Sequence, residues 1–560
     1  MKDFIPKLFS VMKTYSKDQL IKDIISGIIV AIIALPLSIA LAIASGVSPE
    51  KGLYTAIIAG FCISFFGGSR VQIGGPTAAF VVIIYGIIEQ YEIDGLIVAT
   101  IMAGIFMIIF GLCKLGNLIK FIPYTITTGF TAGIAVTIAV GQLKDFMGID
   151  MGALPSEFLQ KIIAMAKNID KFNWVALIIG LLALAIQIFW PMLMKLLPEK
   201  LKYVKAIPGS LIAIIITTVL VNCLNMPVAT IGSLNYDLSA KLPTISLPNI
   251  SLGMIKDLIS PALTIAILAS IESLLSAVVA DGMIGSKHKS NAELIGQGIG
   301  NIMSGLFGGI PATGAIARTA ANIKNGGRTP IAGMVHSVVL LVILLLLMPY
   351  ASWIPMPALA AILIMVAYNM AGIPNCIRLV KRAPKSDILV FVLTFFLTVF
   401  FDLVVAIEVC MIVAAALFMK RAADTNEIKS WDKIQNDEDY DKNNIRYKTI
   451  PKFTQVYEIC GPMFFGMTDK FMNLVIEKDT KVVILRMRSV PSLDVSALQS
   501  LDEIIEKCKK QDITVIFSHV NGQPLKLMKK SKFDIDAGKD NFCANIDEAL
   551  KRAEQLIAAR

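Results

Sequence analysis

Long apolar stretches recur along most of this chain, and they constrain its fold more than any other feature. A helix needs about 20 apolar residues to cross a bilayer core. The chain supplies such stretches repeatedly up to Met419, and the first spans about Ile24–Ala44. That stretch is too long for a signal peptide and lacks a small-residue cleavage site, which predicts a retained helix. Since 55% of the residues are apolar and only 17% are charged, we expect a multi-pass membrane protein.

The net charge of +10 comes from lysine and arginine clusters that flank the apolar stretches. This is the positive-inside pattern of cytoplasmic loops, and it argues against nucleic acid as a partner. About fourteen crossings, with both termini cytoplasmic in a bacterial inner (plasma) membrane, place every cluster inside. The lipid bilayer is then the first expected partner. The clusters lie at residues 114–120, 195–205, 287–289, 324–328 and 378–385.

The eight cysteines are scattered singly and the three histidines are far apart in the sequence. This spacing indicates neither a disulfide framework nor a metal site. The sequence also contains no nucleophile–base pair and no nucleotide-binding loop, so we expect neither an enzyme nor a bound cofactor.

The composition changes once, after the last apolar stretch. Residues 1–423 form the predicted transmembrane domain, residues 424–446 are dense in charge and read as a linker, and residues 447–560 have the hydropathy of a small α/β domain. In that domain, strand-like segments alternate with helical ones. The predicted strands are 456–460, 481–487 and 513–520, and the predicted helices are 468–477, 497–509 and 546–556.

Two short glycine-rich segments interrupt the transmembrane pattern. They read FFGGSRVQIGGPTAAFVV (65–82) and LFGGIPATGAIARTAANI (306–323). They fall at about the third and tenth crossings, so each is the third crossing in a set of seven. Because seven is an odd number, the second set of crossings lies in the membrane in the opposite orientation to the first. Such a matched pair of broken helices points to a midplane binding site between inverted repeats, here about 20–224 and 255–421. Close helix packing is the alternative explanation, and it suffices for GQGIG at 296–300.

Two half-helices whose N-termini meet at the midplane present free backbone N–H groups and two positive dipole ends, which together suit an anion. Thr77 and Ala78 open the first half-helix, and residues 313–316 open the second. Arg318 lies one turn further on and would add a positive charge, although an interfacial side chain or a structural ion pair would also explain it.

Glu272 is the matching acid, within an apolar helix that has no other charge until Asp281. Burial favours the neutral form of a carboxylate, so Glu272 could carry a proton, or it could pair with Arg318 when ionised. Ser276 lies at i+4 on the same helix, so a hydroxyl can share its face. A purely structural ion pair that locks the two repeats together is the alternative.

Three stretches, 52–80, 271–301 and 308–333, resemble the sulfate permease (SulP) family of anion transporters, and the C-terminal region is similar to that family's STAS domain. The resemblance implies a seven-plus-seven inverted repeat with core and gate subdomains, elevator-like motion, and a homodimer with cytoplasmic STAS domains. A cytoplasmic protein partner of the STAS domain would also fit. Carried over by position, the substrate site would use Thr77, Ala78, Glu272, Ser276, Ala315, Ile316 and Arg318.

Two departures from the family refine this expectation. Sodium-using bicarbonate importers of the family have Asp where this chain has Glu272 and lack the arginine, which favours a proton over sodium as the coupling ion. Many members carry Gln after the Pro of the first crossing, whereas this chain has Leu37, as in the branch associated with dicarboxylates. In the STAS-like region, Ser496 occupies the place of a phosphorylated serine, but a serine there could equally be a helix N-cap.

The predicted function is therefore secondary transport of a small inorganic or carboxylate anion, of the dicarboxylate, bicarbonate or sulfate class, coupled to protons through Glu272. An uncoupled anion channel or exchanger is an alternative that Arg318 alone would support. A membrane-anchored sensor that signals through the STAS domain is another, and a nucleobase carrier of the same inverted-repeat fold is a weaker one.

Overall fold

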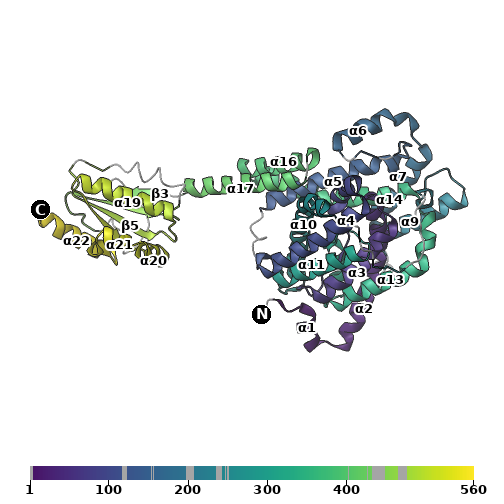
Figure 1. Cartoon of the computed structure of the whole chain (residues 1–560), viewed down its shortest axis with the longest axis horizontal. Helices are drawn as coiled ribbons and strands as arrows, with labels where there is room; N and C mark the ends of the chain where they lie inside the picture. The colour runs from purple at the N-terminus through teal and green to yellow at the C-terminus, as the bar shows by residue number, and fades with distance from the viewer. Residues whose placement is uncertain are drawn as a thin grey trace. The chain divides into compact units, whose positions relative to one another are not determined.

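The computed structural model describes residues 4–559 except 117–122, 153, 156, 197–206, 235–241, 246–247, 249–250, 402, 426, 432–447, 465–475 and 478. The chain divides into two compact units, Met1–Ile412 and Val413–Arg560 (Figure 1). The first unit is helical and the second contains a sheet.

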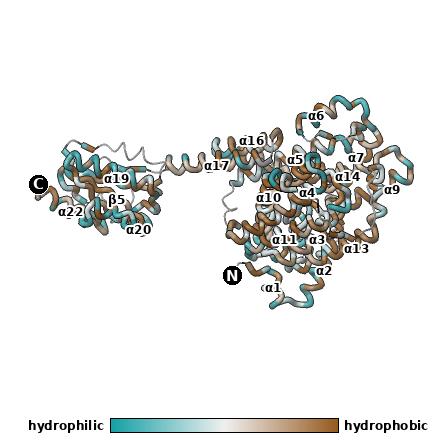
Figure 2. The backbone as a smooth tube through the Cα atoms, in the orientation of Figure 1, coloured by the Kyte–Doolittle hydropathy of each residue, from teal (hydrophilic) through white to brown (hydrophobic). Residues whose placement is uncertain are grey.

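Seven helices of the described residues are long and apolar enough to cross a membrane. Figure 2 shows the apolar colour along α2, α3 and α13 of the first unit. The elements before residue 235 are α1 (Lys7–Val11), η2 (Met12–Thr14), α2 (Lys17–Ala44), α3 (Pro49–Phe66), β1 (Gly74–Gly75), η3 (Ala78–Phe80), α4 (Val81–Leu112), α5 (Tyr124–Met147), α6 (Phe158–Lys167), η5 (Ile169–Lys171), α7 (Trp174–Leu196), α9 (Gly209–Cys223) and η7 (Ile231–Leu234).

The second half repeats this order. It contains α10 (Leu252–Ile284), α11 (Ser290–Leu306), β2 (Thr313–Gly314), α12 (Ile316–Lys324), α13 (Ile331–Leu347), η8 (Met348–Trp353), α14 (Met356–Ala371), α15 (Ile373–Arg382), α16 (Lys385–Phe400) and α17 (Leu403–Thr425). In both halves, two long helices are followed by a two-residue strand and a helix that starts within the fold. In the first half that helix is continuous with the next one in α4, where Glu92 breaks the helical backbone at φ 56°. The predicted inverted repeat of half-helix-containing sets is confirmed.

The two repeats interleave, because α11 packs on α3 and α4 while α13 packs on α2 and α3. A second group forms where α5 packs on α14 and α16, and α7 packs on α9 and α14. These two groups match the expected core and gate subdomains. Glycines allow the closest approach, since a Cβ on Gly298 of α11 would lie 2.5 Å from the carbonyl oxygen of Gly104 on α4. The packing interpretation of residues 296–300 is thereby confirmed.

The second unit is a five-stranded sheet of order β3-β4-β5-β6-β7, in which β3 is antiparallel to β4 and the other pairs are parallel. Helix α19 covers one buried face and α22 the other. The strands are β3 (Glu427–Ser430), β4 (Thr454–Cys460), β5 (Val482–Ser489), β6 (Thr514–Ser518) and β7 (Phe542–Cys543), and the helices are α19 (Val495–Lys510), α20 (Gly522–Lys530), α21 (Phe533–Asp536), η11 (Lys539–Asn541) and α22 (Ile546–Ala558).

The three predicted strands of this unit and its predicted helices at 497–509 and 546–556 are confirmed. The predicted helix at 468–477 lies mostly outside the described residues. The predicted linker at 424–446 is wrong at its start, because residues 427–430 form the edge strand β3 against β4. Three of its four residues are polar, so its composition resembles that of a linker, although only Glu427 is exposed and the other three are half-buried.

Candidate functional site

Two short antiparallel strands bring the two glycine-rich segments together. Gly74 pairs with Gly314 and Gly75 pairs with Thr313, and the Ala315 N–H donates to the Ile73 carbonyl oxygen at 2.9 Å. Strand β1 leads into η3 and α4, and β2 leads into α12. Because the strands are antiparallel, the helices that follow them start beside the same strand pair and leave it in opposite directions. The predicted pair of half-helices that meet at their N-termini is confirmed.

Both half-helix N-termini lack a side-chain cap. Thr77 and Ala315 occupy the capping positions with extended backbones, and neither donates or accepts a capping side-chain hydrogen bond. The first-turn N–H groups of a helix have no acceptor within the helix, and they carry the positive end of its dipole. Ala78 and Ala315 are buried, at 5% and 9% exposed, and their small side chains leave these amides approachable.

Glu272 of α10 contacts the start of the first half-helix. The Thr77 hydroxyl donates to Oε2 of Glu272 at 3.1 Å. The neighbouring Ser273 contacts the second half, since its Oγ lies 2.7 Å from Oγ1 of Thr313 and accepts from the Gly314 N–H at 3.2 Å. Helix α10 thus contacts the start of the first half-helix through Glu272 and the strand before the second half-helix through Ser273.

The buried hydroxyl of Ser276 faces α12, where its Oγ lies 3.5 Å from Oγ1 of Thr319. Ile316, at the first turn of α12, is 45% exposed. Of the predicted site residues, Thr77 and Glu272 are therefore in direct contact, and Ala78, Ala315 and Ile316 lie at the two helix starts. Ser276 contacts the side of the second half-helix.

Arg318 is 3% exposed, and its Nη2 donates to the Pro76 carbonyl oxygen at 3.1 Å. A Cβ on Gly75 would lie 2.5 Å from Nη1, so only glycine leaves room for the guanidinium beside β1. Glu272 was predicted either to carry a proton or to form an ion pair with Arg318. In the described part of the chain, no ion pair joins Arg318 to Glu272. The reason is geometric, because the guanidinium is held at Pro76 whereas the carboxylate is held at Thr77.

Several buried polar residues that hold the site were not predicted from the sequence. Asn322 of α12 donates to the Val71 carbonyl oxygen at 2.8 Å, and Thr319 accepts from the Ile73 N–H at 3.1 Å. Both contacts fix the segment before β1 against the other repeat. The only sequence signal was the unusual polarity of these positions, which does not identify their partners.

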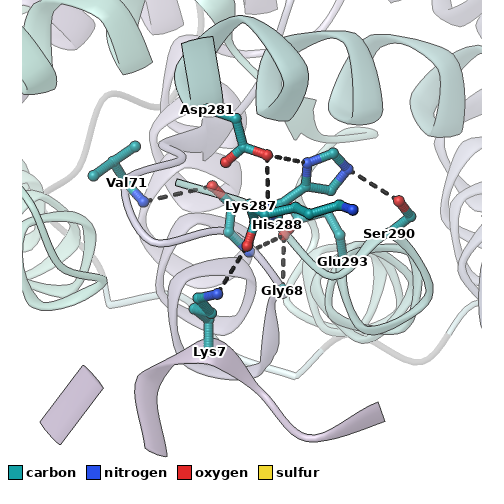
Figure 3. A network of polar contacts seen from close by, with 9 residues as sticks. Lys7, Gly68, Val71, Asp281, Lys287, His288, Ser290 and Glu293 are labelled. Carbon is teal, nitrogen blue, oxygen red and sulfur yellow. Dashed lines mark hydrogen bonds and ion pairs between the residues drawn. The ribbon is translucent and has the colours of Figure 1, made fainter. Parts of the chain in front are cut away.

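The loop between α10 and α11 is closed by a compact polar network (Figure 3). The Asp281 carboxylate accepts from the His288 N–H at 2.7 Å and lies 2.7 Å from Nδ1 of the same residue. Nε2 of His288 lies 3.0 Å from the Ser290 hydroxyl, and Lys7 donates through its Nζ to the Lys287 carbonyl oxygen at 2.8 Å. The network therefore ties the N-terminal segment to the loop that joins the first two helices of the second repeat.

Ser496 of the second unit is exposed at the second position of α19. The alternative prediction that it caps the helix is wrong, because the side chain of Asp494 accepts from the Ala497 N–H at 2.7 Å. The hydroxyl of Ser496 is left outside the cap, and phosphorylation of Ser496 stays a prediction.

Comparisons with known proteins agree with this architecture. A sequence profile of the sulfate permease family matches residues 20–394, and a STAS domain profile matches residues 444–549. YvdB of Bacillus subtilis (strain 168), provisionally named a sulfate transporter, is 40% identical over 96% of this chain and 98% of its own length. The bicarbonate transporter BicA of Picosynechococcus sp. (strain ATCC 27264 / PCC 7002 / PR-6) is 32% identical over 95% of this chain and 94% of its own length.

Solved structures show the same fold. The overall structure of SLC26A9 superposes with a TM-score of 0.85 at 17% identity, over 99% of this chain and 93% of that one. The transmembrane domain of a cyanobacterial bicarbonate transporter BicA superposes with a TM-score of 0.62 at 30% identity, over 71% of this chain and 98% of that one. The chain belongs to the sulfate permease family and carries a C-terminal STAS domain.

Proposed function

We propose that this chain is a proton-coupled secondary transporter of small anions in a bacterial inner (plasma) membrane. The observation that carries the proposal is the contact between Glu272 and Thr77, which places a proton-binding side chain at the start of a half-helix whose amides are uncapped. The names of the relatives as sulfate and bicarbonate transporters support anions as the cargo.

The proposed anion lies between the two helix starts. Each uncapped N-terminus contributes about half an elementary charge. Arg318 adds a full positive charge, and in the described part of the chain no carboxylate pairs with it. An anion would supply the missing negative charge without displacing an internal partner, which favours binding.

Coupling follows from electrostatics. An ionised Glu272 about 5 Å from a bound anion would repel it by about 3 kcal/mol at an effective dielectric constant of about 20. A proton on Glu272 removes this repulsion, so the proton and the anion bind more tightly together than either does alone. Thr77 links the proton site to the proposed anion site, because its hydroxyl contacts the Glu272 carboxylate and its backbone begins the first half-helix.

The transport cycle that we propose is an elevator motion. The strand pair and the half-helices are held inside the core by contacts between the two repeats, so the site can move as one body against the gate helices α5 and α14. In this proposal both termini are cytoplasmic, two copies form a homodimer, and the STAS domain is the regulatory part that binds a cytoplasmic partner. The proton is the coupling ion in place of sodium, and no cofactor takes part.

An uncoupled anion channel or exchanger is the second candidate, and the charge of Arg318, which pairs with no carboxylate among the described residues, favours it. Uptake of labelled succinate, sulfate and bicarbonate into proteoliposomes, with and without an inward proton gradient, separates the two. Gradient-driven accumulation of one anion supports coupling, whereas uptake that ignores the gradient favours the uncoupled function. No flux of any of the three anions, with intact folded protein, would favour the membrane-anchored sensor.

A further inference from the structure

A row of buried polar side chains runs along one face of α11. Glu293, Gln297 and Asn301 are spaced by four residues each, so they lie on one side of the helix. They are 1%, 0% and 0% exposed. Burying polar groups is unfavourable unless hydrogen bonds compensate, so each of these side chains requires partners.

Glu293 finds its partners in the loop that precedes β1. Its Oε2 accepts from the Gly68 N–H at 2.8 Å and from the Ser69 N–H at 2.9 Å, and the Lys289 N–H donates back to the Gly68 carbonyl oxygen at 3.0 Å. Figure 3 shows Glu293 beside Gly68, next to the polar network around Asp281 and His288. Its Oε1 accepts from Nε2 of Gln297 at 2.8 Å, so three N–H donors surround one carboxylate.

Glycine is required at this contact. A Cβ on Gly68 would lie 2.1 Å from the Lys289 carbonyl oxygen, and one on Gly67 would lie 2.9 Å from Oε2 of Glu293. The Gly-Gly pair that precedes the first half-helix is thereby explained as the place where a carboxylate from the other repeat meets the backbone.

The second repeat contains a corresponding contact. Helix α3 stands in the first repeat where α11 stands in the second, and its Thr55 accepts from the Ile310 N–H at 2.7 Å, next to Gly309. Asn301 of α11 adds a contact within the same repeat, since it accepts from the Ala312 N–H at 2.8 Å, just before β2. Each half-helix is thus approached through a loop that is held by the second helix of the opposite repeat.

We infer that Glu293 is a positioning residue for the anion site, which holds the segment from Gly67 to Thr77 so that the first half-helix presents its amides to the anion. This inference rests on the proposed transport function. Glu293 is not predicted to touch the anion, because the side chain is buried and both carboxylate oxygens already accept hydrogen bonds from Gly68, Ser69 and Gln297. It acts by fixing the loop at Gly68 and Ser69, which precedes β1 and the first half-helix.

The test compares Glu293→Ala and Glu293→Gln in the full-length protein in nanodiscs and proteoliposomes. Asn291→Ala is the control, because Asn291 is a buried polar residue of the same helix whose side chain accepts from the Gly116 N–H, away from both half-helices. Hydrogen exchange of peptides covering residues 67–80 reports the loop directly, and labelled sulfate uptake gives KM and Vmax.

We expect Glu293→Ala to speed exchange at 67–80 and to raise the KM for sulfate about tenfold, with Vmax changed less than about threefold, since a misplaced half-helix loses anion binding. Glu293→Gln should stay within about twofold of wild type, because its amide oxygen can still accept from both loop N–H groups and the Gln297 amide can turn its oxygen toward the new NH2. Asn291→Ala should leave exchange at 67–80 and the KM for sulfate unchanged.

Wild-type exchange and KM in a folded Glu293→Ala variant would overturn the inference, and so would a loss in Glu293→Gln as large as in Glu293→Ala. If Glu293→Ala does not fold, Glu293→Asp decides with the same readouts, because its shorter side chain withdraws the carboxylate from Gly68 and Ser69. If the wild type transports no sulfate, sulfate is excluded as a substrate of the proposed transporter. Hydrogen exchange at residues 67–80 alone then decides whether Glu293 positions the loop.

Discussion

Replacing Gly75 with alanine is expected to weaken anion binding by displacing Arg318. A Cβ at this position would lie 2.5 Å from Nη1 of Arg318, and the backbone of Gly75 has φ +155°, which other residues rarely adopt. Normal contact at about 3.4 Å requires the guanidinium to retreat by about 1 Å. Retreat from about 4 to about 5 Å from an anion weakens the attraction by about 0.8 kcal/mol at an effective dielectric constant of about 20, or about fourfold in Kd.

The assay is equilibrium binding of the transported anion to purified Gly75→Ala, alongside its thermal unfolding midpoint. Crowding and backbone strain should also destabilise the core by about 1–3 kcal/mol, so a control for stability is needed. Gly129→Ala serves, because its Cβ would lie 2.6 Å from the Phe391 carbonyl oxygen, between α5 and α16 and away from Arg318. The reasoning is refuted if Gly75→Ala is folded and binds the anion as tightly as Gly129→Ala does.

Three further predictions concern single hydrogen bonds. Thr77→Val removes the donor to ionised Glu272, so the pH profile of uptake should move to higher pH, whereas Thr77→Ser should keep the wild-type profile. Ser273→Ala leaves the buried Gly314 N–H without this acceptor and should lower stability by about 1–3 kcal/mol in thermal unfolding. Ser270→Ala should cost less, because the Ser270 hydroxyl donates to the Ala266 carbonyl oxygen of its own helix. Asp494→Ala should destabilise the start of α19 by about 1 kcal/mol and speed its hydrogen exchange, and Asp494→Asn, which also caps, should not.

The sequence allowed the fold to be predicted because its strongest patterns are local. Apolar length marked the crossings. In two matched segments, a Gly-Gly pair followed by a Pro, small residues and a Thr marked the half-helices. Strand-like apolar runs that alternate with helical segments marked the strands β4, β5 and β6. The short polar elements β3 and α20 were missed, because EIKS and GQPLKLMKK have the composition of loops.

The candidate site was predictable as a set of residue types but not as a set of contacts. Glu272 and Arg318 stood out as charges in apolar surroundings, yet the sequence could not show that Arg318 donates to Pro76 while Glu272 accepts from Thr77. Those partners are far apart along the chain, and the orientation of each side chain depends on how the repeats interleave. The contact of Glu293 with Gly68 was invisible for the same reason.

Proton coupling through Glu272 is the central claim, and Glu272→Gln in proteoliposomes tests it most directly. Gradient-driven accumulation of the anion is measured beside exchange of labelled for unlabelled anion at equal pH, with Glu89→Gln, an exposed acid outside the site, as the control. We predict that Glu272→Gln loses the accumulation and keeps the exchange, because its neutral side chain resembles the protonated acid but releases no proton. Accumulation at the wild-type rate in Glu272→Gln would contradict the account.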